Sequence, residues 1–430
     1  MNRLLLFLTA TIACASAKPN IVVIMADDLG YECIAANGGT SYKTPHLDQM
    51  AKQGMRFEHC YSQPICTPSR VKLMTGISNI RNYVEFGLLD PKQTTFAHLL
   101  KKEGYATCVV GKWQLKGGME GPGHFGFDDY ALWQITRRPS RYPNGGLEVN
   151  GQNVDYTNGE YLPDVVSDHA CNFIEKNKEQ PFLLYYPMIL THCPFEPTPD
   201  SKDWDPKSPG SKTYKGDAKY FGDMVTYMDK IVGKILAKLD ETGLRENTLV
   251  IFLGDNGTDK PVVSMMNGRK VVGAKGAMHD GGNRVPCIAT WPGTVPAGSV
   301  STEILDFSDV LPTLCEISGT ATPDNIDGKS LLATLKAPKT KHRDHIYMWY
   351  SRSGQNKGAR SFARNQRYKL YSDGKLYDIK NDVLEKKPLD LTALSDELKQ
   401  THTMLQSGLN KFHGQRPAHL GLPKKKKNKK

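Results

Sequence analysis

Short apolar runs alternate along the chain with longer segments that carry an apolar residue every three or four positions. The clearest runs, at 21–26, 105–110, 182–186 and 249–253, are apolar almost throughout. Runs of this length are typical of strands buried on both faces, as in a parallel sheet covered by helices. The pattern therefore predicts an α/β fold, with a mostly parallel central sheet flanked by helices on both faces.

One segment has an especially regular helical pattern. Over about 217–239, apolar residues recur at the spacing of one helix face, at Tyr220, Met224, Tyr227, Met228, Ile231, Ile235 and Leu239. We predict a helix that packs this face on the core. The methionines in it fit core packing better than a binding stripe.

The pattern changes after about residue 340. Short strand-like segments at 347–350, 367–371 and 375–379 follow one another, and a Ser-Asp-Gly turn joins the last two. We predict a large N-terminal domain over 18–340, a small antiparallel C-terminal subdomain over 341–415, and a basic, disordered tail over 416–430.

Residues 1–17 have the pattern of an export signal. Arg3 precedes an apolar stretch at 4–13, and an Ala-Ser-Ala sequence at 15–17 supplies a cleavage site. The stretch is shorter than the ~20 residues needed to span a bilayer. We predict a signal peptide at 1–17, a secreted or periplasmic mature protein, and no membrane span.

Composition and charge narrow the class of protein. The chain of 430 residues is 39% hydrophobic and 23% charged, as in ordinary globular proteins. Its net charge of +11 owes much to six lysines among residues 424–430. This end of the chain is most simply a solvated tail, although it also suits loose attraction to polyanions. Nucleic acid is not an expected partner of an exported chain.

Cysteines are scattered rather than grouped. Apart from Cys14 in the export signal, the chain has eight cysteines and no C-x-x-C pair. This spacing indicates neither a zinc site nor a dense disulfide framework.

One cysteine, Cys66, opens a motif with a distinctive order. Cys66, Pro68, Ser69 and Arg70 form a C-x-P-S-R sequence, and an L-x-T-G sequence follows at 73–76. A helix beginning at Ser69, after Pro68 in the turn, would direct unpaired N–H groups and positive potential at an anion near Cys66. Arg70 would add a fixed cation beside that anion.

This motif resembles the signature of the type I, formylglycine-dependent sulfatases, an arylsulfatase-like family of the alkaline phosphatase superfamily. The resemblance implies that a dedicated maturing enzyme oxidises Cys66 to formylglycine, whose hydrate is the nucleophile, and that Arg70 stabilises the hydrate. Other family patterns extend the resemblance over roughly residues 18–390. The domain at 18–340 is then the expected catalytic domain.

Acidic and amide side chains follow two of the predicted strands. Asp27 and Asp28 come directly after the first strand, and Asp255 and Asn256 follow the fourth. Both pairs resemble metal-binding pairs of the family, and ligands of open α/β sheets bind where strands end. Oxygen donors suit a hard cation. We expect one Ca²⁺ ion, held by these four residues and the oxidised Cys66.

Basic residues elsewhere resemble the substrate contacts of the family. Lys112, in a Gly-Lys-Trp sequence, resembles the lysine that contacts the sulfate, and Lys275 resembles a second such lysine. His192, in a Thr-His-x-Pro-Phe sequence, resembles the histidine that faces the leaving group. The resemblance therefore implies catalytic roles for Cys66, Arg70, Lys112, His192 and Lys275.

One further candidate, Gln114, departs from the family pattern. It stands two residues after Lys112, where the family commonly has histidine. A glutamine side chain donates and accepts hydrogen bonds but does not take up a proton near neutral pH. We count Gln114 among the candidate catalytic residues and predict that it orients the nucleophile or the substrate.

A basic segment at 131–146 is the candidate for substrate recognition. It contains three arginines and two aromatic residues, namely Arg137, Arg138, Arg141, Trp133 and Tyr142. Arginines beside aromatic rings suit a sulfated sugar chain by charge and by stacking. An exposed basic loop without a ligand is the plainer alternative.

These patterns together predict an enzyme that hydrolyses sulfate esters on a sulfated polysaccharide or oligosaccharide. Two alternatives stay open. A phosphonate or phosphodiester hydrolase of the same superfamily would use the same nucleophile. The second alternative is a non-catalytic protein that binds sulfated glycans. The only observation that favours it is the glutamine at position 114, where the family commonly has histidine.

Overall fold

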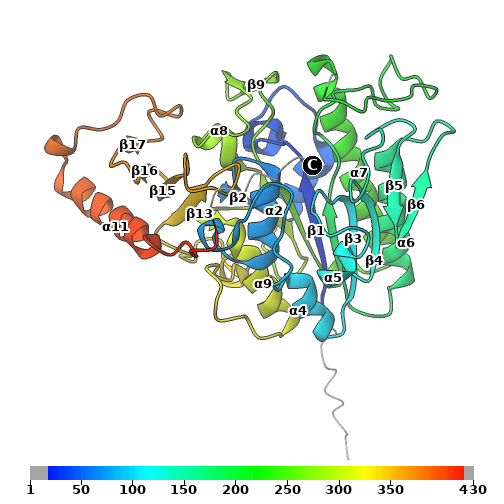
Figure 1. The fold of residues 1–430 in the computed structure, drawn as a ribbon, viewed down its shortest axis with the longest axis horizontal. Coiled ribbons are helices and arrows are strands. Elements are labelled where there is room, and N and C mark those ends of the chain that lie inside the picture. Colours follow the sequence, from blue (N-terminus) through cyan, green and yellow to red (C-terminus); the bar gives the residue numbers. More distant parts are fainter. Residues whose placement is uncertain (1–17, 215, 421–430) are drawn as a thin grey trace, which may run out of the picture.

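The central sheet dominates the fold. The computed structural model describes residues 18–214 and 216–420, and in these the main sheet has eleven strands. Its middle is parallel, in the order β8 (Thr248–Gly254), β1 (Asn20–Ala26), β7 (Phe182–Pro187), β3 (Ala106–Lys112) and β4 (Asp129–Trp133). These strands run side by side through the body of the molecule (Figure 1). The predicted mostly parallel sheet is confirmed.

Antiparallel strands extend this sheet at both edges. Beyond β4 come β5 (Gly146–Val149) and β6 (Gln152–Asp155), both antiparallel to their neighbours. Beyond β8, the strands are β12 (Cys287–Thr290), β2 (Met55–Tyr61), β11 (Arg284–Val285) and β13 (Ser299–Asp306), of which β13 is parallel to β2. The apolar runs predicted the buried centre, whereas these edge strands carry mixed residues.

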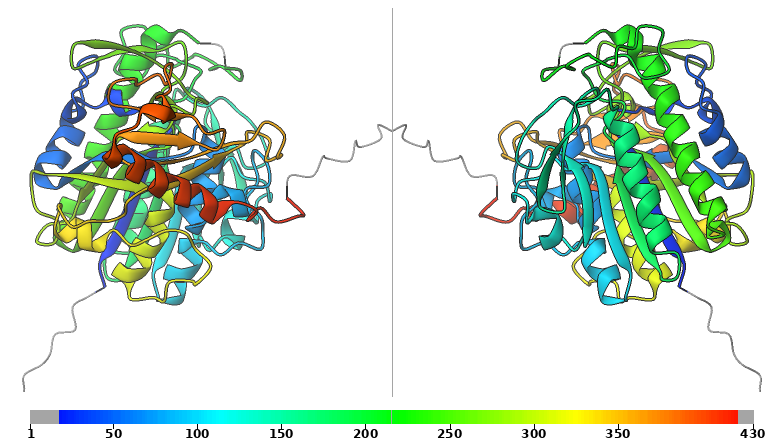
Figure 2. Two further views of the ribbon diagram at one scale, coloured as in Figure 1. Left: turned by 90° about the vertical axis from the view of Figure 1, so that its left-hand side faces the viewer. Right: turned by 90° about the vertical axis from the view of Figure 1, so that its right-hand side faces the viewer.

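Helices cover both faces of the sheet (Figure 2). One face packs against α1 (Pro45–Gln53), α6 (Leu162–Lys176) and α7 (Phe221–Glu241), and the other packs against α2 (Cys66–Thr75), α4 (Phe96–Lys102) and α9 (Val310–Ser318). Along β1, Val22 and Ile24 face the first set, while Val23 and Met25 face the second. Alternate side chains of one fully buried strand therefore fill two cores. The regular helical pattern predicted at 217–239 corresponds to α7.

A second, antiparallel sheet follows in the C-terminal part of the chain. It contains β14 (Ile346–Tyr350), β15 (Arg360–Arg364), β16 (Tyr368–Tyr371) and β17 (Leu376–Asp378). The helix α11 (Asp396–Phe412) places Leu405 and Leu409 in the core shared with this sheet. The small antiparallel C-terminal sheet is confirmed, although β15, which has arginine at both ends, was not predicted.

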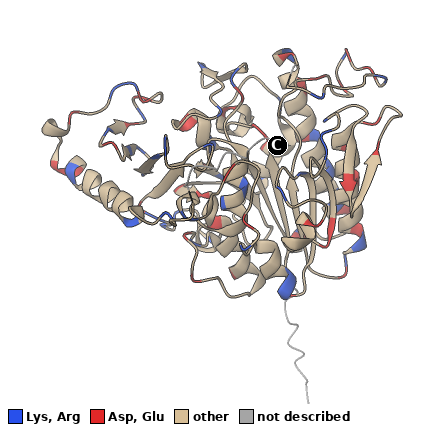
Figure 3. Cartoon of the chain, viewed as in Figure 1, with Lys and Arg blue, Asp and Glu red and all other residues tan. Residues whose placement is uncertain are grey.

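Short elements complete the described chain: α3 (Asn79–Asn82), α5 (Gly121–His124), α8 (Asp280–Asn283), β9 (Val263–Met266), β10 (Arg269–Val272) and α10 (Leu332–Lys336). Acidic and basic residues are intermixed along the ribbon (Figure 3). The predicted signal peptide lies outside the described residues, as do residues 421–430 of the predicted tail. No helix in the described chain has both the length and the apolar character that crossing a membrane requires.

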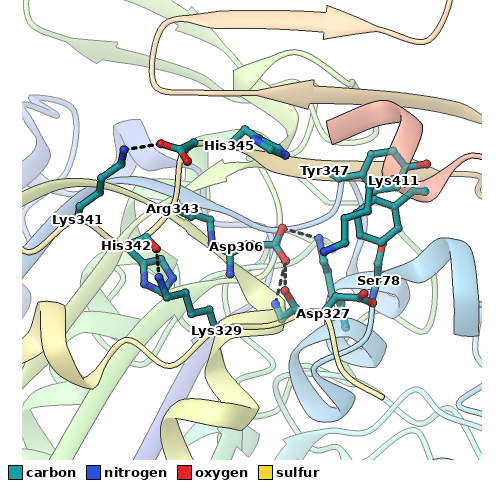
Figure 4. A pocket seen from close by; sticks show the side chains of 14 residues that line it. Ser78, Asp306, Asp327, Lys329, Lys341, His342, Arg343, His345, Tyr347 and Lys411 are labelled. Carbon is teal, nitrogen blue, oxygen red and sulfur yellow. Dashed lines mark hydrogen bonds and ion pairs between the residues drawn. The ribbon is translucent and has the colours of Figure 1, made fainter. Parts of the chain in front are cut away.

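A cleft of about 620 Å³ lies where the C-terminal sheet and α11 meet the main domain (Figure 4). Lys72 of α2 and Asp306 of β13 line it from one side, and Tyr347 and Phe412 line it from the other. The two aromatic rings are stacked, with centroids 4.2 Å apart. This cleft lies beyond the end of α2 that is remote from Cys66.

Candidate active site

The candidate residues gather at the carboxyl ends of the central strands. Residue Ala26 of β1 pairs with Gly254 of β8, so the residues that follow each strand lie beside one another. The backbone N–H of Asp28 donates to Oδ1 of Asp255 over 3.0 Å. Parallel strands end at a common edge, and this edge therefore brings together the two acidic pairs of the sequence.

Two side-chain oxygens at this edge have no hydrogen-bond partner among the described residues. They are Oδ1 of Asp27 and Oδ1 of Asn256, and both are fully buried. The amide of Asn256 is oriented because its Nδ2 donates to Oδ1 of Asp28 over 2.8 Å. A buried polar atom without a partner costs about 1–3 kcal/mol. A hard cation with oxygen ligands would satisfy both atoms, so these residues fit the expected Ca²⁺.

Charge at this edge also favours a cation. Burial raises the pKa of Asp28, with Lys275 opposing and Asp27 adding to the shift. Burial and the neighbouring Asp27 raise the pKa of Asp255 to about 8. Burial acts in the same direction on Asp27, but Lys112, His192 and two arginines outweigh it and hold that pKa well below its usual value. Burial therefore makes two of the three carboxyl groups harder to ionise, and a bound cation would favour their charged forms.

Cys66 is the first residue of α2 and is buried. The prediction that this helix begins at Ser69 was wrong, because Pro68 lies inside the first turn. A proline is tolerated there, since the N–H groups of a first turn have no partner within the helix. Ser69 stabilises the first turn, because its hydroxyl accepts a hydrogen bond from the N–H of Gln63 over 3.0 Å. Cys66 thus lies in the first turn of a helix, where N–H groups have no partner within the helix.

Gln114 lies against this thiol. The Sγ of Cys66 donates to Oε1 of Gln114 over 2.8 Å. Gln114 follows β3, the strand that ends in Lys112, and its φ of +56° is in the left-handed region. Such a backbone conformation is uncommon for a residue with a side chain and directs the amide at residue 66.

Three basic side chains enclose the acidic cluster. Nζ of Lys112 lies 2.6 Å from Oδ2 of Asp27, and Nζ of Lys275 lies 2.6 Å from Oδ2 of Asp28. Arg70 donates through Nη1 to the carbonyl of Lys112 over 2.8 Å and lies 3.4 Å from Oδ2 of Asp255. These cations contact one oxygen of each aspartate and leave Oδ1 of Asp27 without a partner in the described part of the chain.

His192 reaches the same cluster from the segment after β7. Its Nδ1 lies 2.5 Å from the carbonyl of Cys193, which places the hydrogen on Nδ1 and turns Nε2 towards Oδ2 of Asp28 at 3.6 Å. Burial, followed by the positive charges of Arg141 and Lys275, lowers the pKa of His192 well below its usual value. The imidazole is therefore neutral until a negative group enters the site.

Arg141 is the site residue that the sequence misplaced. It was predicted in a substrate-contacting or exposed loop, but its side chain is only 2% exposed and lies 3.3 Å from Oδ2 of Asp27. Its guanidinium stacks over Trp133 at 4.2 Å. The nearby Tyr142 is buried as well and donates to the carbonyl of Ile189 over 3.0 Å. The neighbouring tryptophan was the one signal in the sequence that an arginine could be stacked and buried here.

The site combines a buried acidic cluster, cationic neighbours and a cysteine at a helix N-terminus, all at one edge of an α/β sheet. This combination is typical of hydrolases that act on anionic substrates. Comparison of the sequence with protein-family models identifies the family. The sulfatase family model matches residues 19–320, and the C-terminal model of N-sulphoglucosamine sulphohydrolase matches residues 272–414. The chain belongs to the sulfatase family and is a sulfuric ester hydrolase.

Individual relatives agree with this assignment. Arylsulfatase A of Homo sapiens is 32% identical, over 86% of this chain and 77% of that protein. N-acetylgalactosamine-6-sulfatase of Canis lupus familiaris is 32% identical, over 80% of this chain and 72% of that protein. Among solved structures, Ps i-CgsB in complex with k-i-k-neocarrahexaose has a TM-score of 0.74 and 26% identity, with 93% of this chain and 94% of that chain covered.

Proposed function

We propose that this sulfuric ester hydrolase removes sulfate from a sulfated oligosaccharide or polysaccharide, with a nucleophile made from Cys66 and one Ca²⁺ ion. The observation that carries the proposal is the pair of buried oxygens, on Asp27 and Asn256, that have no partner among the described residues. They lie in an acidic cluster that Arg70, Lys112 and Lys275 enclose. Such an arrangement suits a cation and a sulfate group bound together.

The proposal assigns the Ca²⁺ ion to Asp27, Asp28, Asp255, Asn256 and residue 66. When bound, the ion would balance negative charge on the sulfate oxygens. Oxidation of the Cys66 thiol to formylglycine, by a maturing enzyme outside this chain, would supply an aldehyde whose hydrate carries the attacking hydroxyl. Arg70, which contacts Asp255 and the carbonyl of Lys112, would hold that hydrate in place.

The remaining side chains bind the substrate and move one proton. Lys112 and Lys275 exchange part of their contact with Asp27 and Asp28 for the sulfate oxygens. The sulfate brings negative charge to His192 and thereby favours a proton on Nε2. The attacking hydroxyl of residue 66 would bond to sulfur and lose its proton to water. As the sulfur–oxygen bond to the alcohol breaks, the proton on His192 would pass to the departing oxygen. Overall, one water is consumed, an alcohol and sulfate are released, and residue 66 returns to its starting state.

Gln114 orients residue 66 in this scheme. Its Oε1 accepts from the side chain at position 66 and, lacking a titratable proton, does not take part in proton transfer. The proton that leaves residue 66 during sulfate release then goes to water or to another side chain.

Names of relatives support a glycan substrate. N-acetylgalactosamine-6-sulfatase and N-sulphoglucosamine sulphohydrolase are named for sulfated sugars, and Ps i-CgsB was solved with a neocarrahexaose. The expected export signal at residues 1–17 supports a secreted or periplasmic enzyme that meets such polymers outside the cell.

The test compares turnover of a sulfate and a phosphate ester of one aryl alcohol, followed by desulfation of a panel of sulfated glycans. We expect preference for the sulfate ester and activity on at least one glycan. Peptide mass spectrometry of the active protein should show residue 66 as formylglycine and Lys18 as the first residue. Preference for the phosphate ester, or full activity with unmodified Cys66, contradicts the proposal.

A further inference from the structure

The three arginines of residues 131–146, the segment predicted to recognise substrate, lie in different environments. Arg141 is buried beside Asp27. Arg137 is tied to Asp155 through an ion pair of 2.5 Å and donates to two backbone carbonyls. Arg138 alone is exposed and has no hydrogen bond or ion pair with another described residue. One of the three therefore has its charge free for a ligand.

Arg138 lies over the aromatic ring of Tyr214, which also lies against the ring of the active-site residue His192. Its guanidinium carbon is 4.3 Å from the centre of the Tyr214 ring. The same ring lies 5.5 Å from the ring of His192. Tyr214 is 53% exposed, which is unusual for so large a side chain. The three residues form a continuous path from the histidine that faces the leaving group to an unpaired cation.

A cleft of about 440 Å³ opens beside this path. Its lining includes Arg138 and Lys212, and Lys212 is exposed and without an ion pair among the described residues. The carboxylate that lines the cleft, Asp155, is already held by Arg137. The cleft thus carries two uncompensated positive charges, and its volume falls within the ~300–1,000 Å³ range of small-ligand sites.

We propose that Tyr214, Arg138 and Lys212 form an extended subsite for a second anionic group on the sugar chain, next to the sulfate that is removed. The inference rests on the proposed function and names its substrate class: a glycan with at least two anionic groups close together. The Tyr214 ring stacks on the sugar that carries the leaving oxygen, and the guanidinium of Arg138 binds the second anion bidentately. Lys212 adds a second positive charge to the same anion.

The second anionic group is an oxyanion, either a sulfate ester or the carboxylate of a uronic acid. Both bind a planar guanidinium in the same manner. The two sources are separated by testing oligosaccharides that differ only at this group, bearing sulfate, carboxylate or hydroxyl. Preference for either charged form over the hydroxyl form supports the subsite and identifies its ligand.

The experiment measures kcat/KM on these oligosaccharides for the wild type, Arg138→Gln, Lys212→Gln and Tyr214→Ala. The matched control is Lys336→Gln, because Lys336 is exposed and lines a separate cleft with Arg245, which precedes the start of β8. We expect the wild type to prefer the doubly charged substrate, and Arg138→Gln to reduce that preference about tenfold, as for one charge-assisted hydrogen bond. Lys212→Gln should reduce it less, and Lys336→Gln should leave it unchanged.

Two results overturn the inference. One is equal kcat/KM on the charged and hydroxyl forms in the wild type, and the other is an unchanged preference in Arg138→Gln. Turnover of a small aryl sulfate in the same preparation separates the two proposals. Aryl sulfate turnover without preference for the second anion removes the subsite alone, whereas no turnover of any sulfate ester removes the proposed function.

Discussion

Two clusters of buried charge lie at the two ends of α2, and they differ in how completely their carboxylates are hydrogen-bonded. At the active site, Oδ1 of Asp27 has no partner among the described residues. In the cluster that borders the cleft of Figure 4, both oxygens of Asp309 accept two contacts each, from the N–H groups of Asp306 and Lys329 and from the side chains of His342 and Arg343. Nearby, Asp306 binds Lys72 at 2.5 Å.

Both clusters hold one carboxyl group with a lowered pKa, Asp27 or Asp309, but the active site also holds two with a raised pKa. Burial opposes ionisation of Asp309, but Arg343 and His342 outweigh it and hold its pKa below the usual value. At the active site, burial raises the pKa of Asp28 and Asp255 despite the cations around them. A cluster whose hydrogen bonds are complete stabilises the fold, whereas one with spare buried oxygens is suited to a ligand.

The largest effect is expected at Cys66. Replacing it with alanine removes the nucleophile, and loss of such a residue lowers kcat on the order of 10⁵–10⁶-fold. The fold should be unaffected, because the thiol makes a single hydrogen bond with the described residues, to Gln114. Turnover of an aryl sulfate and the Tm of Cys66→Ala check both parts. Retained turnover would mean that the nucleophile lies elsewhere.

Asp309→Asn should show the opposite of Cys66→Ala, with a loss of stability rather than of turnover. The change leaves Arg343 without its buried counter-charge, and removing one partner of a buried pair costs about 3–5 kcal/mol. We expect a lower free energy of unfolding in denaturant, of the same size with and without calcium. Asp373→Asn, in the exposed turn before β17, is the control for loss of a carboxylate. A loss below about 1 kcal/mol would show that this cluster is not structural.

Calcium should distinguish the two clusters directly. Added Ca²⁺ at 100 times its Kd would stabilise the wild type by about 2.7 kcal/mol, since it binds only the folded state. Asp255→Asn removes one charged ligand and should abolish this stabilisation and most of the turnover. Without calcium, its stability should fall less than that of Asp309→Asn, because repulsion from Asp27 and Asp28 offsets the ion pair of Asp255 with Arg70. Calcium titration followed by Tm measurement tests this, and an equal Tm rise in Asp255→Asn contradicts the assigned site.

Acid should weaken the structural cluster through Asp309. A carboxyl group with a lowered folded pKa contributes stability above its unfolded pKa, near 4, and loses it as the pH falls through the folded value. The difference in unfolding free energy between wild type and Asp309→Asn should be constant from pH 7 to about 4. It should then shrink by about 1.4 kcal/mol for each unit of pKa depression. Shrinkage that is complete above pH 5 would contradict the lowered pKa.

The sequence predicted the centre of the fold better than its edges. Strands buried on both faces leave continuous apolar runs, as in β1 and β8, and the polar residues after them were candidates without further information. Edge strands such as β6 bury few side chains, so their pattern is weak. The strand β15 lies inside the C-terminal sheet, but arginines at both of its ends interrupt the apolar pattern. Arg141 shows the limit for the site: its burial depends on the ring of Trp133 and on Asp27, which is far away in the sequence. The nearby tryptophan hints at the stacking, but no local pattern reveals the contact with Asp27.

The smallest expected effect on the rate is at Gln114. There the loss of a hydrogen bond can be separated from the strain of the backbone. Its Oε1 accepts one hydrogen bond from residue 66, and a neutral bond of this kind contributes about 0.5–1.5 kcal/mol. Gln114→Ala should therefore lower kcat/KM about tenfold, far less than Cys66→Ala.

Gln114→Gly is the matched variant, because the backbone there has a φ of +56°. Glycine adopts this conformation without the penalty of about 1 kcal/mol that a side chain carries. Both variants lose the same contact, so we expect equal rate losses and a higher Tm for the glycine variant. A rate loss in both that approaches that of Cys66→Ala would show that the amide does more than orient residue 66. A much larger loss in glycine than in alanine would instead assign the effect to a backbone that the side chain no longer restrains.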